Sequence, residues 1–234
     1  MAEPRMRVLV DPRGGGGGQD VVTDLAAFYA PVSLPWLRVN MVSTVDGAAT
    51  GATGKSDSVN NDADKLAFDA LRVQADAVIV GAGTARIEGY HTMEKPLVVV
   101  SRSGRVPETL RGSTRGNLLM ATCAAAADLP ATRELVGEEN VLLLGSHRVD
   151  LTALRARLVE RGLRNLLCEG GPHLLRDLLT AGVVDELDAT VVPKLVGGLG
   201  PRITDGPLVE VPLRLHGLLE SDGTLLARWL VGVR

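Results

Sequence analysis

A buried strand, an acid, two glycines and the start of a helix follow one another within ten residues, Leu166–Leu175. Gly170 and Gly171 let a ligand approach bare backbone, and Pro172 suits the first position of a helix, where no hydrogen-bonded N–H is lost. That helix directs its unpaired N–H groups and positive dipole end at the turn, which suits a phosphate or pyrophosphate. Glu169 stands at the edge of the same turn. An ordinary strand-to-helix turn that needs glycine for its geometry alone explains this stretch equally well.

A second glycine turn, Gly81-Ala82-Gly83-Thr84, follows an apolar strand expected over 77–80. It does not match the G-x-G-x-x-G pattern of dinucleotide-binding proteins, because Arg86 stands where the third glycine would be. Alone, this turn is explained more often by local structure than by a ligand. Together with the turn at Gly170 and Gly171, it favours a dinucleotide site that is split between two turns.

A third candidate, Ser101-Arg102-Ser103-Gly104-Arg105, directly follows a strand expected over 97–100. Ser101 offers a hydroxyl and Arg102 a permanent cation that can grip a phosphate through two parallel hydrogen bonds. These groups suit the 2′-phosphate of NADPH. A solvated basic turn is the competing interpretation, and it is the better one for this segment taken alone.

The sequence shows no residue pattern typical of a metal site or of an activated nucleophile. The four histidines, His91, His147, His173 and His216, show neither H-E-x-x-H nor any other ligand spacing, so no metal site is expected. Cys123 and Cys168 have no C-x-x-C partner and are expected to be buried thiols. His173 opens a helix and either touches a cofactor or has no chemical role. Hydride transfer from NADPH, in which the cofactor performs the chemistry, fits this residue set best.

The elements that position these residues alternate between strand and helix. Such alternation predicts an α/β sheet with parallel pairs, closed by an antiparallel C-terminal hairpin. Strands are expected over 37–42, 77–80, 97–100, 118–120, 141–144 and 186–192, helices over 60–73, 124–136, 150–160 and 172–180, and the hairpin over 213–233. Ligands bind beyond the carboxyl ends of strands in such sheets. The segments 40–47, 81–88, 101–105 and 169–176 all fall at that edge.

Length and composition limit the classes of function. The chain has 234 residues, a net charge of −3 and 3% aromatic residues, which argues against nucleic acid or an anionic membrane as partner. No apolar run reaches the length of a membrane helix, and the N-terminus has no signal-peptide pattern, so a cytoplasmic protein is expected. We expect one reductase-sized domain over 33–234, preceded by an extension over 1–32 that holds a flexible glycine loop at 14–18.

The motifs together resemble the reductase of riboflavin biosynthesis, in the dihydrofolate-reductase-like superfamily. The resemblance covers about residues 33–232 and rests on the segments 38–47 (R-V-N-M-V-S-T-V-D-G), 54–56 (G-K-S), 70–72 (A-L-R), 77–84 (A-V-I-V-G-A-G-T) and 168–172 (C-E-G-G-P). It implies a mixed, mostly parallel sheet flanked by helices, bound NADPH and a homodimer. It also implies reduction of a ribosylamino-pyrimidine 5′-phosphate, in which hydride delivered to C1′ opens the ribose to a ribityl chain.

Site residues follow from the resemblance position by position. The resemblance implies cofactor contacts at Ser58, Thr84, Glu88, Gly170, Gly171, Pro172, His173 and Leu174. The turns described above add Gly83, Ser101 and Arg102 as candidate cofactor contacts. The implied substrate contacts are Ser56, Arg72, Lys95 and Glu169, with Arg72 and Lys95 on the ribose phosphate. The catalytic candidates are Glu169, Asn40 and Asp46. Asn40 stands where some members carry Lys, and Asp46 is expected to order its own loop or the nicotinamide pocket.

The chain also departs from the bifunctional members of that family. No H-x-E or P-C-x-x-C deaminase motif precedes the reductase-like region, so deamination is expected to occur elsewhere. The short connection Glu94-Lys95-Pro96 trims the loop on the substrate side. Two alternatives therefore stay open: a reductase of a folate-like or pteridine-like substrate on the same scaffold, and a non-catalytic NADPH-binding protein.

Overall fold

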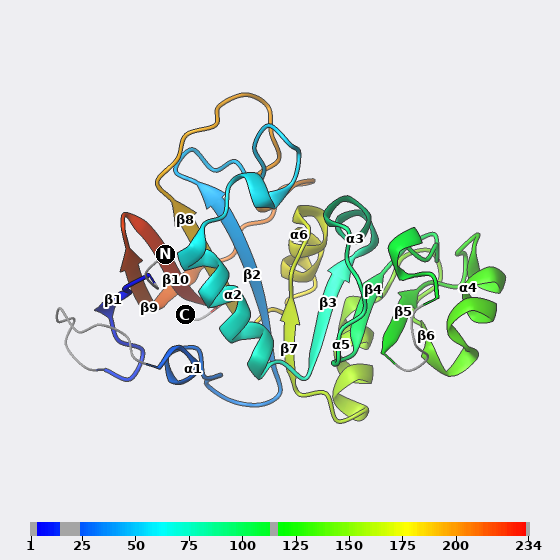
Figure 1. Cartoon of the computed structure of the whole chain (residues 1–234). Helices are drawn as coiled ribbons and strands as arrows, with labels where there is room; N and C mark the ends of the chain where they lie inside the picture. The colour runs from blue at the N-terminus through cyan, green and yellow to red at the C-terminus, as the bar shows by residue number, and fades with distance from the viewer. Residues whose placement is uncertain (1–3, 15–23, 113–116, 233–234) are drawn as a thin grey trace.

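The computed structural model describes residues 4–14, 24–112 and 117–232. Within these ranges ten strands form one sheet in the order β1-β9-β10-β8-β2-β7-β3-β4-β5-β6 (Figure 1). The strands are β1 (Arg7–Val10), β2 (Trp36–Thr44), β3 (Ala77–Gly81), β4 (Leu97–Val100), β5 (Leu118–Thr122), β6 (Val141–Leu143), β7 (Asn165–Cys168), β8 (Glu186–Val192), β9 (Leu213–Ser221) and β10 (Thr224–Val231). The helices are α1 (Leu25–Phe28), α2 (Asp62–Gln74), α3 (Ala82–Glu88), α4 (Leu129–Val136), α5 (Leu151–Glu160) and α6 (Pro172–Thr180).

The sheet has a parallel part and an antiparallel part. Strands β8, β2, β7, β3, β4, β5 and β6 pair in parallel, whereas β10 pairs antiparallel with β8 and with β9, which in turn pairs with β1. The predicted mixed, mostly parallel sheet with an antiparallel C-terminal hairpin is confirmed. In the parallel part, the carboxyl ends of β2, β7, β3 and β4 meet at one edge, which is where ligands bind in α/β folds.

Helices cover both faces of the sheet and enclose two apolar cores. Under α2, the side chains of Ala67 and Leu71 pack with Val78 and Val80 of β3. On the opposite face, Leu154 of α5 and Leu175 of α6 pack with residues of β2 and β7. Each fully buried leucine of this kind contributes about 1.5–3 kcal/mol to folding. The two cores hold the strand ends rigidly, so that residues in the adjoining turns have fixed positions.

Local signals explain where most helices begin. Asn61 caps α2 by accepting a hydrogen bond from the backbone N–H of Asp64, and Asp150 caps α5 in the same way. Helix α6 has the predicted bounds, with Pro172 in its first turn. The helix predicted from residue 124 begins only at Leu129, because Pro130 is tolerated in a first turn but not in a helix interior. In the described residues no helix is long and apolar enough to cross a membrane.

The N-terminal segment packs against the sheet wherever the structure describes it. Strand β1 extends the sheet beside β9, and Phe28 and Tyr29 are buried in the core. Arg228 of β10 donates hydrogen bonds to the backbone carbonyls of Phe28 and Ala30. Most of the predicted glycine loop, residues 15–18, lies outside the described residues. A separate domain starting at residue 33 stays a prediction.

Candidate active site

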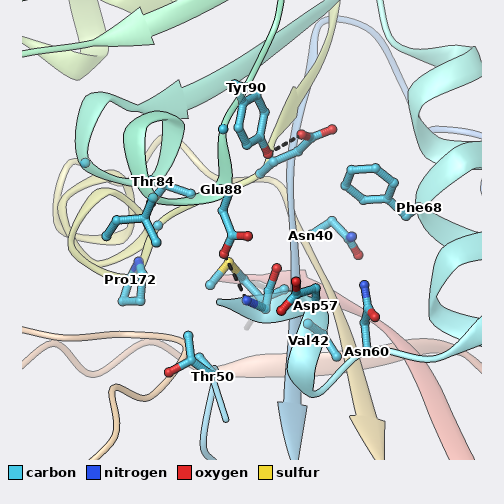
Figure 2. Close-up of a pocket in the computed structure, with 18 of the residues that line it drawn as sticks. Asn40, Val42, Thr50, Asp57, Asn60, Phe68, Thr84, Glu88, Tyr90 and Pro172 are labelled. Carbon is cyan, nitrogen blue, oxygen red and sulfur yellow. Dashed lines mark hydrogen bonds between the residues drawn. The ribbon is translucent and has the colours of Figure 1, made fainter. Parts of the chain in front are cut away.

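A cavity of about 760 Å³ opens at the carboxyl ends of the parallel strands. Its walls are the end of β2, one face of α2, helix α3 with the loop after it, and the turn before α6. Figure 2 shows Asn40 and Phe68 on one side of this cavity and Thr84 and Pro172 on the other. The predicted site residues that line it are Asn40, Ser56, Arg72, Gly83, Thr84, Glu88, Glu169, Gly171, Pro172 and His173. The structure therefore brings together residues that lie up to 133 positions apart.

The two glycine turns meet at this cavity. The N–H of Gly81 donates to the carbonyl of Gly170 over 2.8 Å, which joins the end of β3 to the turn before α6. A Cβ at Gly170 would lie 2.9 Å from the sulfur of Met41, and Gly170 has a φ of +83°. A Cβ at Gly171 would lie 2.2 Å from the hydroxyl oxygen of Thr84. Glycine is thus required at both positions, and the bare backbone borders the cavity beside the first turn of α6.

Glu169 is held by two neighbours inside the cavity wall. Its Oε1 accepts from Nε of Arg72 over 2.6 Å and its Oε2 from Nη2 of Arg72 over 2.7 Å. The hydroxyl of Tyr90 donates to Oε2 over 2.6 Å (Figure 2). The Glu169 side chain is 2% exposed. Burial, followed by the charge of Glu169, raises the pKa of Tyr90 well above its ordinary value. Both carboxylate oxygens therefore have protein partners, and the carboxylate fixes Arg72 and Tyr90 in place.

Arg72 also stacks on an aromatic ring. Its guanidinium carbon lies 4.1 Å from the centroid of the Phe68 ring and 5.8 Å from that of Tyr90. Burial acts to lower the pKa of Arg72, but the hydrogen bond and charge of Glu169 outweigh it and raise the pKa above its ordinary value. The guanidinium is thus permanently charged and held in one plane at the wall of the cavity.

The sequence interpretation missed Asp64, Phe68 and Tyr90. Asp64 lines the cavity but is buried, and its Oδ1 has no hydrogen-bond partner in the described part of the chain. Burial raises the pKa of Asp64, an effect that a hydrogen bond with Thr190 opposes. The spacing of Asp64, Phe68 and Arg72 on α2 was an available signal, since residues four apart share a helix face.

Two predicted residues serve the loop after β2 instead of lining the cavity. Asp46 accepts hydrogen bonds from the hydroxyl of Thr44 and, over 2.7 Å, from the N–H of Gly197, and these bonds lower its pKa. Its predicted role in ordering its own loop agrees with these contacts. The Ser58 hydroxyl accepts from the N–H of Gly51 and donates to the carbonyl of Lys55. Because its hydroxyl is engaged within the loop, Ser58 does not reach the cavity.

The structure does not place Lys95 at the cavity. Its ammonium donates to the backbone carbonyls of Arg72, Val73 and Ala75, over 2.7 Å to Val73 and 2.6 Å to Ala75. These carbonyls belong to the end of α2, where helix carbonyls lack partners and a cation is favourable. An ammonium has three N–H donors, and all three are used. The expectation that Lys95 holds a substrate phosphate is therefore corrected: Lys95 caps a helix.

Comparison with known protein families gives a match over most of the chain. The family model described as the RibD C-terminal domain matches residues 35–226. The chain belongs to this family. A 2,5-diamino-6-ribosylamino-4(3H)-pyrimidinone 5′-phosphate reductase of Methanothermobacter thermautotrophicus is 30% identical over 187 residues, covering 75% of this chain and 86% of that protein. A protein of the same name from Archaeoglobus fulgidus is 30% identical over 190 residues, covering 74% of this chain and 87% of that protein.

A solved structure shares the fold of this RibD C-terminal domain. A pyrimidine reductase-like protein from Corynebacterium diphtheriae matches with a TM-score of 0.77 and 22% identity, over 91% of this chain and 100% of that one. At this identity the likeness shows the fold alone.

Ser101, Arg102 and Leu174 do not line the cavity of this RibD-type domain, whereas His173 does. Ser101 and Arg102 directly follow β4, which neighbours β3, so they lie at the same sheet edge beyond the glycine turns. Ser101 is buried and Arg102 is exposed. Leu174 is a core residue of α6. His173 is exposed at the cavity mouth, where its Nδ1 lies 2.9 Å from the carbonyl oxygen of Asp205.

Cys168 lies directly before Glu169, and burial raises the pKa of its thiol to about 12. Cys123 is also buried. Among the described residues no group of three or more His, Cys, Asp or Glu side chains could hold a metal ion.

Proposed function

We propose that this RibD-type domain is an NADPH-dependent oxidoreductase that reduces a ribosylamino-pyrimidine 5′-phosphate by hydride delivery to C1′. The observation that carries the proposal is one cavity that joins two different surfaces. One is the pair of glycine turns at Gly83 and Gly171, and the other is the polar and aromatic face of α2. The names of the archaeal relatives, which are 5′-phosphate reductases of a diaminopyrimidinone riboside, agree with this substrate class.

The glycine turns fit the diphosphate and nicotinamide part of a dinucleotide. Gly171 lets the Thr84 hydroxyl approach the backbone, 2.2 Å from where a Cβ would lie, and Gly171, Pro172 and His173 at the start of α6 line the cavity. Backbone N–H groups at a helix start bind phosphate oxygens. When bound, the reduced nicotinamide would supply the hydride. Gly83, Thr84, Gly171 and Pro172 would hold the cofactor here, and Glu88 keeps the neighbouring loop in place by accepting from the N–H of Ser56 over 2.9 Å.

The α2 side of the cavity fits the substrate. Asn40, in the middle of β2, presents an amide that can hydrogen-bond the reacting amine, and Phe68 offers a face for the pyrimidine ring (Figure 2). Tyr90 and Arg72, both fixed by Glu169, form the wall beyond Phe68. Holding C1′ in one orientation toward the cofactor is the main contribution that such residues make to the rate.

The test is oxidation of NADPH, followed by absorbance, with the ribosylamino-pyrimidine 5′-phosphate as substrate. Turnover that depends on both reactants, with a ribityl product identified by mass spectrometry, is the expected result. Oxidation of NADPH without formation of the ribityl product would contradict the proposal. An exchange of NADPH for NADH in the same assay tests the cofactor preference, and light scattering tests the predicted homodimer.

A folate-like or pteridine-like substrate is a second candidate because of Asp64. This buried carboxyl lies in the cavity wall with an oxygen that lacks a partner. A carboxylate can accept from two adjacent N–H groups, as on a 2-amino-4-oxopyrimidine edge, which folates and diaminopyrimidinones share. Dihydrofolate is therefore assayed in parallel. Turnover of dihydrofolate alone would favour this candidate, and binding of NADPH without any turnover would favour a non-catalytic protein.

A further inference from the structure

The cavity holds few cations for a substrate that carries a phosphate. Among the described lining residues, Lys65 and Arg72 are the only lysine or arginine. Both lie on α2, seven residues apart. Seven residues of an α-helix make about two turns, so the two side chains leave the same face of the helix, and Phe68 lies between them. Lys95, the other cation expected here, is engaged at the end of α2.

Arg72 by itself has little net charge to offer. Its guanidinium forms a two-bonded pair with Glu169, whose side chain is 2% exposed, and the pair as a whole is neutral. The pair uses one hydrogen on Nε and one on Nη2, so the edge formed by Nη1 and Nη2 keeps three N–H donors. That edge can hold two oxygens of a phosphate. That edge supplies oriented N–H donors but little net charge. A phosphate monoester carries about −1.5 to −2 charges at pH 7, and these need compensation.

Lys65 can supply that compensation. Its ammonium pairs with Asp69 over 2.7 Å, but the two side chains are 67% and 51% exposed. An exposed pair four residues apart on a helix contributes little to stability, because water screens both charges. Exchange of Asp69 for a phosphate oxygen therefore costs little. The Arg72–Glu169 pair is largely buried and bidentate, so it does not release its cation in this way.

We infer that Lys65 supplies the net positive charge that binds the 5′-phosphate of the substrate, with the outer edge of Arg72 as its second partner. This inference rests on the proposed function for the identity of the phosphate ester. It assigns to Lys65 the role that the sequence alone suggested for Lys95. It also makes Asp69 a competitor for the same ammonium, since the carboxylate and the phosphate cannot both accept the same N–H donors.

The experiment measures binding separately from turnover. Ribose 5-phosphate and ribose are titrated into the protein and followed by NMR, and KM values are measured for the pyrimidine riboside with and without its phosphate. Lys65→Met keeps most of the apolar stem and removes the charge. We expect it to weaken ribose 5-phosphate binding and to raise KM for the phosphorylated substrate by about tenfold, the low end for a hydrogen bond to a charged group. Ribose binding, and KM for the unphosphorylated substrate, should stay within twofold.

Two matched variants complete the test. Lys95→Met removes the ammonium outside the cavity, and we expect it to lower the thermal midpoint without changing the preference for ribose 5-phosphate over ribose. Asp69→Asn frees Lys65, and we expect ribose 5-phosphate to bind more tightly. The inference would be overturned if Lys65→Met kept the preference for ribose 5-phosphate over ribose. It would also be overturned if Lys95→Met lost as much of that preference as Lys65→Met. Because the titration needs no turnover, it decides the role of Lys65 even if the pyrimidine substrate is not reduced.

Discussion

Replacement of Glu169 by glutamine distinguishes a structural role of this carboxylate from a role in turnover. The carboxylate accepts three hydrogen bonds, two from Arg72 and one from Tyr90, over 2.6 to 2.7 Å. Glutamine keeps one acceptor oxygen but turns an NH₂ group toward a donor, so at least one bond to a charged group is lost. Such a bond is worth about 1.5–3 kcal/mol.

The stability change follows from the burial of the two partners. Glu169 is buried, but the Arg72 side chain is 33% exposed, so water compensates part of the guanidinium charge that Glu169→Gln leaves unpaired. We expect a loss of about 2 kcal/mol in the free energy of unfolding, toward the low end of the range for a broken hydrogen bond to a charge. For a chain of this length that corresponds to a thermal midpoint lower by about 4–8 °C. Tyr90→Phe, which removes one bond to the Glu169 carboxylate and no charge, should lose about 1.5 kcal/mol, the low end for a hydrogen bond to a charged group.

The kinetic change should be larger than the change in cofactor affinity. Without the carboxylate, Arg72 and Tyr90 lose their common anchor on the substrate side, and a misplacement of about 1 Å can cost roughly 100-fold in rate. We therefore expect kcat to fall by about 10²-fold, with NADPH affinity within a few fold. Fluorescence titration and single-turnover kinetics measure the two effects. Unchanged turnover would assign Glu169 to the scaffold alone, and weaker NADPH binding alone would assign it to the cofactor turn. A stability loss below about 0.5 kcal/mol, within the range of ordinary surface substitutions, would refute the paired geometry.

Three further predictions concern cofactor binding and the independence of activity from metal ions. Arg102→Ala should reduce the preference for NADPH over NADH by about 1–3 kcal/mol, since Arg102 is expected to bind the 2′-phosphate; equal binding of both cofactors by the unchanged protein would contradict this. Gly171→Ala should abolish NADPH binding measured by fluorescence, because its Cβ would lie 2.2 Å from the Thr84 hydroxyl. Gly200→Ala is the control, since a Cβ there meets only the backbone oxygen of Thr50 at 3.8 Å. Activity should survive prolonged incubation with a chelator, as no metal ligands were predicted; stoichiometric zinc in untagged protein would argue against this mechanism.

Several elements could be predicted from the sequence because their signals are local. Helix α6 has the predicted bounds, since a strand, two glycines and Pro172 mark its start within a few residues. The cap at Asn61 and the hairpin turn before β10 were also marked by residue type. The edge at which ligands bind followed from the alternation of strands and helices, because parallel strands place their carboxyl ends together.

The face of α2 shows where local signals were insufficient. Not every apolar side chain of α2 enters the core, since Phe68 lines the cavity and Val73 is 75% exposed. Ala63, Ala67 and Leu71 are the buried apolar residues of this helix instead. Which stripe of a helix is buried depends on the surface that covers it, and here one flank of α2 borders a cavity and not a strand.

The sequence by itself determined the α/β class, the two glycine turns and the residue types available for hydride-transfer chemistry. The residues that indicate each of these features lie within short segments of the chain. Only the tertiary structure decided which partners those residues have. Arg72 meets Glu169 across 97 positions of chain and Lys95 meets the end of α2. Such pairings depend on strand order and helix packing, and a charged side chain accepts whichever nearby partner best satisfies its hydrogen bonds. For that reason the charge available to a phosphate became visible only in the folded chain.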